Sequence, residues 1–317
     1  MSDTVRGRTV GVVGVGYMGG AVARSLLRAK FDVVVYDVRP EAVQKLVDAG
    51  ARAAKDLEDL ARQCAAIGVV VVSDAQVKDV GPRIVAAAKP GAKILIHSTV
   101  RPSTAVELAE LARPKDIAVL DVGVNGGNEK ADLGKLTLMI GGDDESVRWA
   151  WPYFEAVGQH IFHVGPLGSG LVGKLVNNLI AIGSYALQLE AMQLAAAYGM
   201  SEDTVTTMVS ASQGDNRGIR TWGRHDRKRA ERAAQGVDWS ESMGRDLEEA
   251  AIASGARGVM LPITATIAQA LPTKLRMRDR ELAKRGGAPK YPLCRGCDQE
   301  LAAPFRTAGI HPECRPD

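Results

Sequence analysis

Short apolar runs alternate with amphipathic stretches from residue 9 to residue 164, and this alternation constrains the fold more than any other feature of the chain. The apolar runs are Thr9 to Val13, Asp32 to Tyr36, Ala66 to Val72, Lys93 to His97, Ile117 to Leu120 and Leu136 to Ile140. Strands separated by helical stretches form a parallel sheet with right-handed crossovers, and fully apolar strands suit a sheet covered on both faces. The pattern predicts an α/β domain over residues 1–166.

After Gly170 the pattern becomes wholly helical. The expected helices are Leu171 to Tyr198, a helix opened by Ser201, Trp239 to Ser254 and Leu261 to Leu271. The first of these would join the α/β domain to an all-α domain over residues 167–290. Five polar residues (Asn177, Asn178, Gln188, Glu190 and Gln193) interrupt its apolar stretch, so we expect a mostly buried helix rather than a membrane span. An apolar helix of this length favours a homodimer or homotetramer.

Charge and cysteine content argue against several other classes of protein. The 40 Lys and Arg residues against 37 Asp and Glu give a net charge of +3. The stretch from Pro272 onward has ten basic and six acidic residues, a surplus of four, so the remainder stands at −1. A surface that binds nucleic acid over its whole area is therefore not expected. The polar N-terminus lacks the pattern of a signal peptide and Cys64 stands alone, so we expect a cytoplasmic protein.

A glycine pattern follows the first strand. Gly14-Val15-Gly16-Tyr17-Met18-Gly19 lies between the strand Thr9 to Val13 and the helical stretch Ala21 to Arg28. The three glycines permit a tight turn, a close approach of backbone to a pyrophosphate and close packing of helix on strand, with the helix N-terminus directed at the phosphates. The pattern therefore predicts a Rossmann-type dinucleotide site.

The next strand ends at Asp37, 18 residues after Gly19, where a carboxylate would meet the ribose hydroxyls. Asp37 favours NAD because it would repel a 2′-phosphate. Arg39 could instead pair with that phosphate, so NADP stays open as the alternative. The complete set of expected cofactor residues is Gly14, Gly16, Tyr17, Met18, Gly19, Asp37, Val38, Arg39, Val72, Ser73, Thr99 and Arg245.

Two further segments carry polar groups. Lys174 and Asn178 lie four residues apart at the start of the long helix, and therefore on one face of it. A lysine and asparagines in an apolar helix must offset the cost of desolvation; the structural alternative is that Lys174 reaches solvent and the asparagines bridge helices. The segment Asp121 to Gly127 follows a strand, and its backbone N–H groups could bind an anion, or it could be an ordinary glycine-rich turn.

Taken together, these segments resemble the β-hydroxyacid dehydrogenase family, which includes 3-hydroxyisobutyrate dehydrogenase, tartronate semialdehyde reductase and the shorter relatives of 6-phosphogluconate dehydrogenase. The resemblance spans roughly residues 8–271. Six signatures occur in the family's order: Gly14 to Gly19, Ser98-Thr99 with Pro102, Asp121 to Gly127, Met139 to Asp143, Gly168 to Asn178, and Arg245-Asp246-Leu247 in place of the usual Lys-Asp-Leu.

The resemblance implies the roles of the site residues. Lys174 would be the catalytic residue, and Asn178 would hold the substrate. Gly126 and Gly127, with Asn125, would bind the substrate carboxylate, and Thr99 would lie near the nicotinamide ribose.

Three positions depart from the family pattern. Gly123 and Asn125 replace the family's Pro and Ser in the substrate loop, and the bulkier Asn125 can alter which acid fits. Asn177 stands where the phosphogluconate branch has His, which disfavours 6-phosphogluconate as the substrate.

The function implied is an NAD(P)-dependent oxidoreductase that transfers hydride between a small β-hydroxy acid, or its semialdehyde, and the nicotinamide, with Lys174 as acid and base. One rival is an imine or other carbonyl reductase on the same scaffold, against which Lys174 argues. The other is a non-catalytic dinucleotide-binding interaction protein.

Residues outside these signatures have plainer interpretations. His97, His160, His163 and His225 lack metal-ligand or triad spacing, so we expect solvated or packed imidazoles, and Cys64 is expected to be an apolar filler. Residues 217–232 contain seven basic and two acidic residues, which predict a solvated helix face or, alternatively, a surface for an anionic ligand or a partner.

The C-terminal tail has a metal-ligand pattern. Cys294 and Cys297 form a C-x-x-C pair, and His311 and Cys314 follow after 13 intervening residues. Three thiolates and one imidazole suffice for a closed tetrahedral zinc site, so residues 291–317 are expected to form a small structural zinc knuckle.

Overall fold

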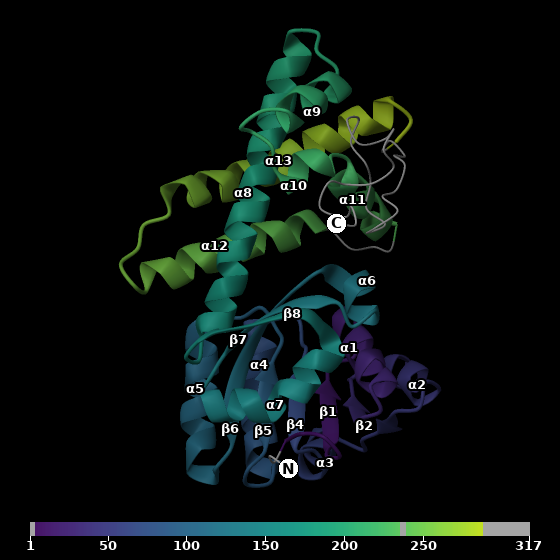
Figure 1. Ribbon diagram of the computed structural model, residues 1–317, viewed down its shortest axis with the longest axis vertical. Helices are drawn as coiled ribbons and strands as arrows, with labels where there is room; N and C mark the ends of the chain where they lie inside the picture. The colour runs from purple at the N-terminus through teal and green to yellow at the C-terminus, as the bar shows by residue number, and fades with distance from the viewer. Residues whose placement is uncertain (1–3, 235–238, 288–317) are drawn as a thin grey trace. The chain divides into compact units, whose positions relative to one another are not determined.

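The computed structural model describes residues 4–234 and 239–287. The chain divides into two compact units, Met1–Val176 and Asn177–Asp317, and each is described by itself (Figure 1).

The first unit is built on one eight-stranded sheet with the strand order β3-β2-β1-β4-β5-β6-β7-β8. The strands are β1 (Thr9–Val13), β2 (Asp32–Tyr36), β3 (Arg52–Ala53), β4 (Ala66–Val69), β5 (Lys93–Ile96), β6 (Ala118–Asn125), β7 (Leu136–Gly141) and β8 (Gly158–Gly165). All neighbouring strands are parallel except β6 and β7. The order reverses at β1 and β4, which is the point where open α/β sheets bind their ligands.

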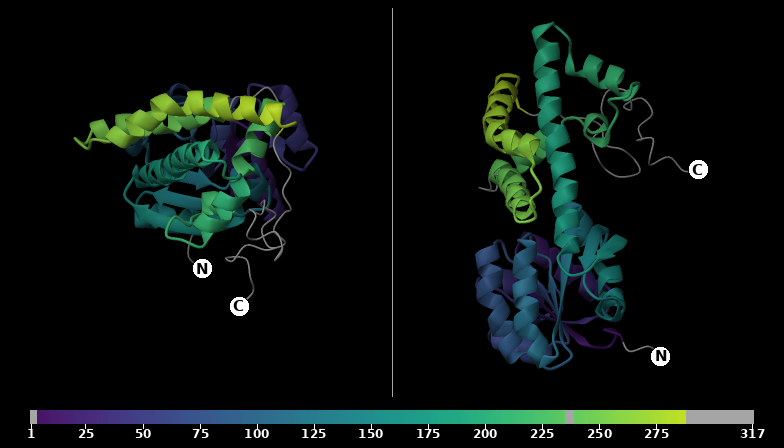
Figure 2. Two further views of the ribbon diagram at one scale, coloured as in Figure 1. Left: turned by 90° about the horizontal axis from the view of Figure 1, so that it is seen from above. Right: turned by 90° about the vertical axis from the view of Figure 1, so that its left-hand side faces the viewer.

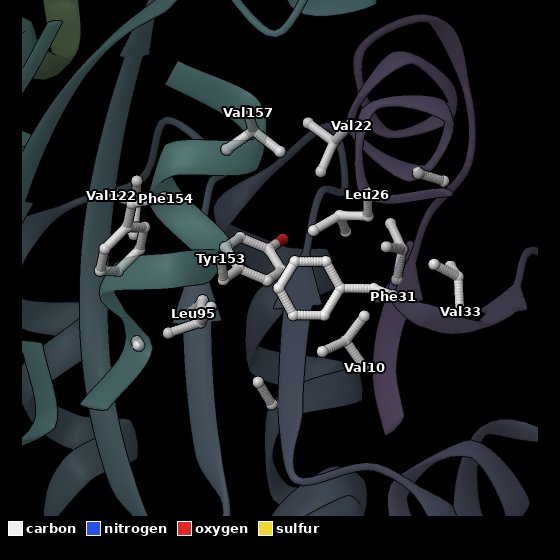
Figure 3. Packing of buried hydrophobic residues seen from close by; sticks show 14 of the residues in the cluster. Val10, Val22, Leu26, Phe31, Val33, Leu95, Val122, Tyr153, Phe154 and Val157 are labelled. Carbon is white, nitrogen blue, oxygen red and sulfur yellow. The ribbon is translucent and has the colours of Figure 1, made fainter. Parts of the chain in front are cut away.

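Helices cover both faces of this sheet, as the apolar strands predict. They are α1 (Tyr17–Arg28), α2 (Pro40–Val47), α3 (Leu57–Gln63), α4 (Asp74–Ala87), α5 (Pro102–Ala112), α6 (Gly127–Asp132) and α7 (Asp144–Val157), with a 3₁₀ turn at Arg113–Lys115. The core on one face includes residues of α1 and α7, among them Leu26 of α1 and Tyr153 and Phe154 of α7 (Figure 3). The core on the other face includes residues of α3, α4 and α5.

The sheet differs from the expected one in two respects. The strand predicted to end at Leu120 continues to Asn125, because residues 121–125 pair antiparallel with β7. The segment Asp121 to Asn125 is therefore a strand rather than a loop, and only Gly126 lies between it and α6, which begins at Gly127. β3 and β8 were not predicted: β3 has two residues, both exposed, and most residues of β8 are polar or exposed.

The long helix α8 (Ser169–Ala197) begins in the first unit and continues into the second (Figure 2). It meets the length and composition of a membrane-crossing helix, and 33% of its most apolar window is buried. The expectation of a mostly buried helix is therefore wrong for this chain taken alone. Its exposed apolar residues include Ile180, Leu187 and Leu194.

The second unit is helical. Besides the rest of α8 it contains α9 (Glu202–Ser210), α10 (Arg217–Arg220), α11 (Arg224–Ala233), α12 (Trp239–Gly255) and α13 (Pro262–Lys284). Its apolar core joins Tyr185 and Leu189 of α8 to Trp222, Leu247 and Leu275.

A buried ionic network ties α11 to α13. The carboxylate of Asp226 accepts hydrogen bonds from Arg229 at 2.8 Å and from Arg278 at 2.8 Å, and Arg278 also donates to Glu202. Asp226, Arg229 and Arg278 are each at most 6% exposed. The basic segment 217–232 is thus not simply a solvated face, since two of its charged residues lie inside the unit.

Candidate active site

The glycine turn after β1 has the backbone geometry that the sequence pattern requires. Gly14 has φ +82, and a Cβ there would lie 2.5 Å from the carbonyl oxygen of Val70. A Cβ on Gly19 would overlap the carbonyl of Gly14. A side chain at Gly19 would push α1 away from the turn after β1, and one at Gly14 would push this turn away from the end of β4, so the glycines hold the helix N-terminus close to the sheet edge.

Asp37 lies at this turn, directly after β2, and its carboxylate is fully engaged. Oδ2 accepts from the backbone N–H of Val15 at 2.8 Å and from Arg39 Nη2 at 3.3 Å. Oδ1 accepts from the backbone N–H of Arg39 at 3.0 Å and from its Nε at 3.1 Å. Partial burial raises the pKa of Asp37, but the hydrogen bonds from Arg39 and Val15 outweigh it, so the pKa lies below its usual value. The carboxylate is therefore ionised and paired with the exposed Arg39.

The other predicted cofactor residues of the first unit follow the carboxyl ends of β4 and β5. Val72 is 75% exposed, and Ser73 caps α4 by accepting the N–H of Gln76. Ser98 joins the two strand ends, because its hydroxyl oxygen accepts the N–H of Val71 at 2.9 Å, and half-buried Thr99 follows it. Tyr17 and Val38 are exposed at the ends of the turn and β2. These positions share one edge of the sheet.

Asp121 attaches the start of α8 to the sheet. Its buried carboxylate accepts the backbone N–H of Gly168 at 2.7 Å and that of Leu171 at 2.7 Å. Burial raises the pKa of Asp121, and the N–H donors of Leu171 and Gly168 offset only part of this effect. The first turn of α8 is thereby fixed over β6.

Lys174 lies one turn further along α8 and contacts the same strand. A Cβ on Gly123 would overlap the carbonyl of Gly170 and would lie 2.8 Å from the Cβ of Lys174. Lys174 itself is half-buried. Asp121, Gly123 and Asn125 alternate along β6 and so share the face opposite to the core residues Leu120, Val122 and Val124. One face of one strand therefore carries the predicted substrate loop and the support of the predicted catalytic lysine.

At the end of this face, a side chain of the predicted substrate loop forms a hydrogen bond with the backbone of the same loop. Asn125 is half-buried, and its Oδ1 accepts the backbone N–H of Gly126 at 3.0 Å. Gly126 and Gly127 follow with φ +131 and +73.

In the second unit, Asn178 is 7% exposed and donates through Nδ2 to Asp246 Oδ2 at 2.7 Å, while Asn177 donates to Asn178 Oδ1 at 3.1 Å. Asp246 belongs to the Arg245-Asp246-Leu247 signature, so two family signatures meet here. Arg245 is exposed on α12.

Asp121 and Asp246 were not assigned roles from the sequence. A signal for Asp121 was available, because a single carboxylate in the apolar run Ala118 to Val124 must find partners when buried. Asp246 and Asn178 lie 68 residues apart in the sequence, so no local sequence pattern indicates their contact.

The remaining polar candidates are packed or buried in ways that suit a structural role. His97 is buried and its Nε2 lies 3.0 Å from the hydroxyl of Tyr153; burial lowers the pKa of His97 to about 4. His225 stacks on Tyr185 at 4.3 Å. Cys64 is buried, which raises its pKa to about 12, so it is the expected apolar filler.

Within residues 4–234 and 239–287, no group of three or more metal-ligating side chains could hold an ion. Cys294, Cys297, His311 and Cys314 lie outside the described residues.

Two family models match this chain in succession. Residues 9–165 match the NAD binding domain of 6-phosphogluconate dehydrogenase. Residues 168–283 match the domain described as NAD-binding of NADP-dependent 3-hydroxyisobutyrate dehydrogenase.

Relatives of similar length carry related names. An NAD-dependent L-serine dehydrogenase of Pseudomonas aeruginosa is 33% identical over 78% of this chain and 86% of its own length. A 3-hydroxyisobutyrate dehydrogenase of the same organism is 35% identical over 65% of this chain and 70% of its own length. The fold of Mycobacterium tuberculosis 3-hydroxyisobutyrate dehydrogenase, in a structure with L-serine, is similar with a TM-score of 0.77 at 22% identity, over 95% of this chain and 99% of that one.

We predict that Asp121→Asn destabilises the first unit by about 2 to 3 kcal/mol. The amide has only one oxygen, so one of the two buried backbone N–H groups would face the NH₂ group of the amide, which is itself a donor. Urea unfolding measures the change. The matched control is Asp143→Asn, which replaces the capping carboxylate of α7 and should cost less than about 0.5 kcal/mol because Asn caps helices equally well. Equal losses for both variants would contradict the assignment of Asp121 as an anchor of α8.

Proposed function

The chain belongs to the β-hydroxyacid dehydrogenase family and is an NAD(P)-dependent oxidoreductase, and we propose that it oxidises a small β-hydroxy acid to its semialdehyde with Lys174 as the base. The observation that carries the proposal is the support of Lys174 by β6, where Asp121 anchors the start of α8 and Gly123 admits its first turn. L-Serine and 3-hydroxyisobutyrate are the first substrates to test, since relatives are named for them.

The protein's part in the reaction is to orient the alcohol and move one proton. The nicotinamide, when bound, accepts the hydride from the carbon that bears the hydroxyl. Lys174 Nζ, as the neutral amine, would take the hydroxyl proton, and in the reverse direction the ammonium would polarise the carbonyl and return the proton.

Substrate binding would fall to the residues that the family resemblance assigns. Asn125, Gly126 and Gly127 would bind the carboxylate, and Asn178 would hold the reacting part of the acid. The hydrogen bond from Asn178 to Asp246 supports this assignment because it fixes the orientation of the amide.

The two rival functions are less well supported. An imine reductase has no evident need for an amine base held as Lys174 is held. A non-catalytic dinucleotide-binding protein would have no reason to keep both Lys174 and Asn178.

NAD is the cofactor we propose, with NADP as the alternative. The ionised Asp37 at the end of β2 would repel a 2′-phosphate, but its four hydrogen bonds leave it no free acceptor while Arg39 is in place. Binding of NAD through the ribose hydroxyls would therefore require Arg39 to turn away. The exposed guanidinium of Arg39 is also the group that would meet a 2′-phosphate.

We further propose that the exposed face of α8 joins two copies of this chain. Ile180, Leu187 and Leu194 are 67%, 66% and 65% exposed and lie seven residues apart. Residues seven apart lie on one face of a helix, and an oligomer would cover an exposed apolar face of this kind. A cytoplasmic, soluble homodimer or homotetramer is the form that we expect.

The C-terminal tail supports a separate proposal from ligand spacing alone. Cys294, Cys297, His311 and Cys314 would bind one structural zinc ion.

For Lys174→Ala we predict a fall in kcat of about 100- to 10,000-fold with L-serine or 3-hydroxyisobutyrate, because the acid/base group is lost. Dissociation constants for NADH should stay within about twofold, as followed by the fluorescence of the reduced nicotinamide. Lys135→Ala, an exposed lysine, is the control. Near-normal turnover of Lys174→Ala would rule out its role as acid and base.

The Arg39→Ala variant should raise the KM for NADP by at least about tenfold, because it removes the guanidinium that would pair with the 2′-phosphate. The KM for NAD should be unchanged or lower, because the variant frees the carboxylate of Asp37 for the ribose hydroxyls. Absorbance of the reduced nicotinamide measures both constants. Arg113→Ala, at an exposed site, is the control. An equal effect on the two cofactors would contradict the pairing argument.

A charge placed in the repeat on α8 should dissociate the oligomer. Light scattering of the wild-type protein is expected to give a multiple of the 33.6 kDa chain, and Leu187→Glu a lower multiple. Met208→Glu places the same charge on another exposed apolar residue and should leave the mass unchanged. A monomeric wild type would end the proposal.

Removal of residues 286–317 should abolish bound zinc, measured by elemental analysis as about one ion per full-length chain. Zinc content that the deletion does not change would exclude the C-terminal site.

A further inference from the structure

The helix α5, which follows β5, begins without a capping side chain of its own. Its N-cap residue is Arg101, whose side chain makes no capping hydrogen bond, and its first turn contains no acidic residue. The loop before it, residues 97–101, contains half-buried Thr99, which we expect to lie near the nicotinamide ribose. The N–H groups at the start of a helix need acceptors from outside the helix. The place of this loop therefore depends on a group from another element.

Asp74 of the neighbouring helix α4 supplies that group. Its Oδ1 accepts the backbone N–H of Arg101 at 3.2 Å and the hydroxyl of Thr104 at 2.7 Å. Thr104 lies in the first turn of α5 and is 2% exposed, so its hydroxyl has little access to water. One carboxylate oxygen of α4 thus serves as the cap that α5 lacks.

The turn that carries Asp74 is itself fixed, so this residue can act as a support. The hydroxyl oxygen of Ser98 accepts the N–H of Val71 at 2.9 Å. The side-chain oxygen of Gln76 accepts the N–H of Val72 at 2.8 Å. The chain is therefore held on both sides of the step from β4 to α4, and the carboxylate of Asp74 starts from a defined position.

The N-terminus of α5 also supports the start of α8. Gly168 has φ +95, and a Cβ there would lie 3.3 Å from the Cβ of Pro102, the first residue of α5. The N–H of Gly168 is one of the two that Asp121 accepts. A displacement of α5 would therefore be felt both at Thr99 and at the segment that leads to Lys174.

We propose that Asp74 is a positioning residue of the cofactor site: its two hydrogen bonds to the N-terminus of α5 hold Thr99 where it meets the nicotinamide half of the dinucleotide. This inference rests on the proposed cofactor and on the expected place of Thr99, and not on the identity of the acid. The glycine turn and Asp37, which we expect to hold the adenosine half, are fixed by contacts of their own. Only the nicotinamide half should therefore depend on Asp74.

Equilibrium titration of the full-length protein with NADH and with ADP tests the proposal. ADP contains the adenosine and two phosphates but lacks the nicotinamide ribose, so its affinity reports on the glycine turn and Asp37. Fluorescence of the reduced nicotinamide measures NADH binding, and displacement of NADH measures ADP binding. Urea unfolding of each variant shows that it is folded under the conditions of the titration.

Four variants separate the two hydrogen bonds from general loosening of the unit. Asp74→Ala removes both bonds, and Thr104→Val removes one at nearly constant volume. Asp74→Asn keeps an oxygen that can accept both, and its NH₂ group would replace Oδ2, which lies 3.7 Å from the exposed amine of Lys78. Asp143→Ala is the control, because it removes the cap of α7 on the other face of the sheet.

Asp74→Ala should raise the dissociation constant of NADH by at least about tenfold, and Thr104→Val by at least about threefold, while that of ADP stays within about twofold. Asp74→Asn should bind NADH within about threefold of wild type, because the amide oxygen restores both bonds. Asp143→Ala should bind both ligands as the wild type does.

Unchanged NADH affinity in Asp74→Ala would overturn the inference. Equal losses for NADH and ADP would do the same, since a residue that only stabilises the unit affects both halves of the site. A loss in Asp74→Asn as large as that in Asp74→Ala would also contradict it. If Asp74→Ala does not fold, Thr104→Val decides, and unchanged NADH affinity in that variant refutes the role of Asp74.

These titrations need no turnover, so they separate this inference from the proposed function. The predicted losses in a wild type that binds NADH but oxidises none of the acids would retain the role of Asp74 and refute the reaction. Oxidation of an acid by a wild type whose Asp74→Ala variant binds NADH normally would retain the reaction and refute the role. A wild type that binds no reduced dinucleotide would refute both.

Discussion

The two hydrogen bonds from the start of α8 to Asp121 are the interaction on which the rest of the site depends. A buried carboxylate is costly unless donors surround it, and here the donors are the N–H groups of Gly168 and Leu171, at a helix N-terminus whose dipole also favours a negative charge. The helix cannot slide along the sheet without breaking both bonds. Because Lys174 lies one helical turn later, the same two hydrogen bonds also fix the position of its backbone over β6.

The two faces of β6 have different roles, because successive side chains of a strand point to opposite faces of the sheet. Leu120, Val122 and Val124 fill the core on one face, while Asp121 and Gly123 on the other receive α8. A one-residue slip of the pairing with β7 would exchange the two sets and bury the carboxylate among apolar side chains. The apolar core of the first unit therefore also specifies the register of the face that carries Asp121 and Gly123.

The fold class and the glycine turn were predictable because both depend on local periodicity and on residues close in sequence. The end of β6 was not, since Asp121 interrupts the apolar run and its strand conformation depends on pairing with β7. The network of Asp226 with Arg278 joins residues 52 apart, so the basic composition of residues 217–232 suggested only a surface. The exposed face of α8 was also missed, because apolar content alone does not show which residues a single chain can cover. The contact of Asn125 with Gly126 depends on the side-chain conformation, which no sequence pattern encodes.

Lys174 and Asn178 are carried by one unbroken helix, so the covalent chain sets their spacing. Each residue of an α-helix turns the chain by about 100° and advances it by about 1.5 Å. A single residue inserted between them would keep both functional groups and the helix, yet would rotate the amide by about 100° from its present direction relative to the lysine. This segment can therefore vary in the type of its intervening residues far more freely than in their number.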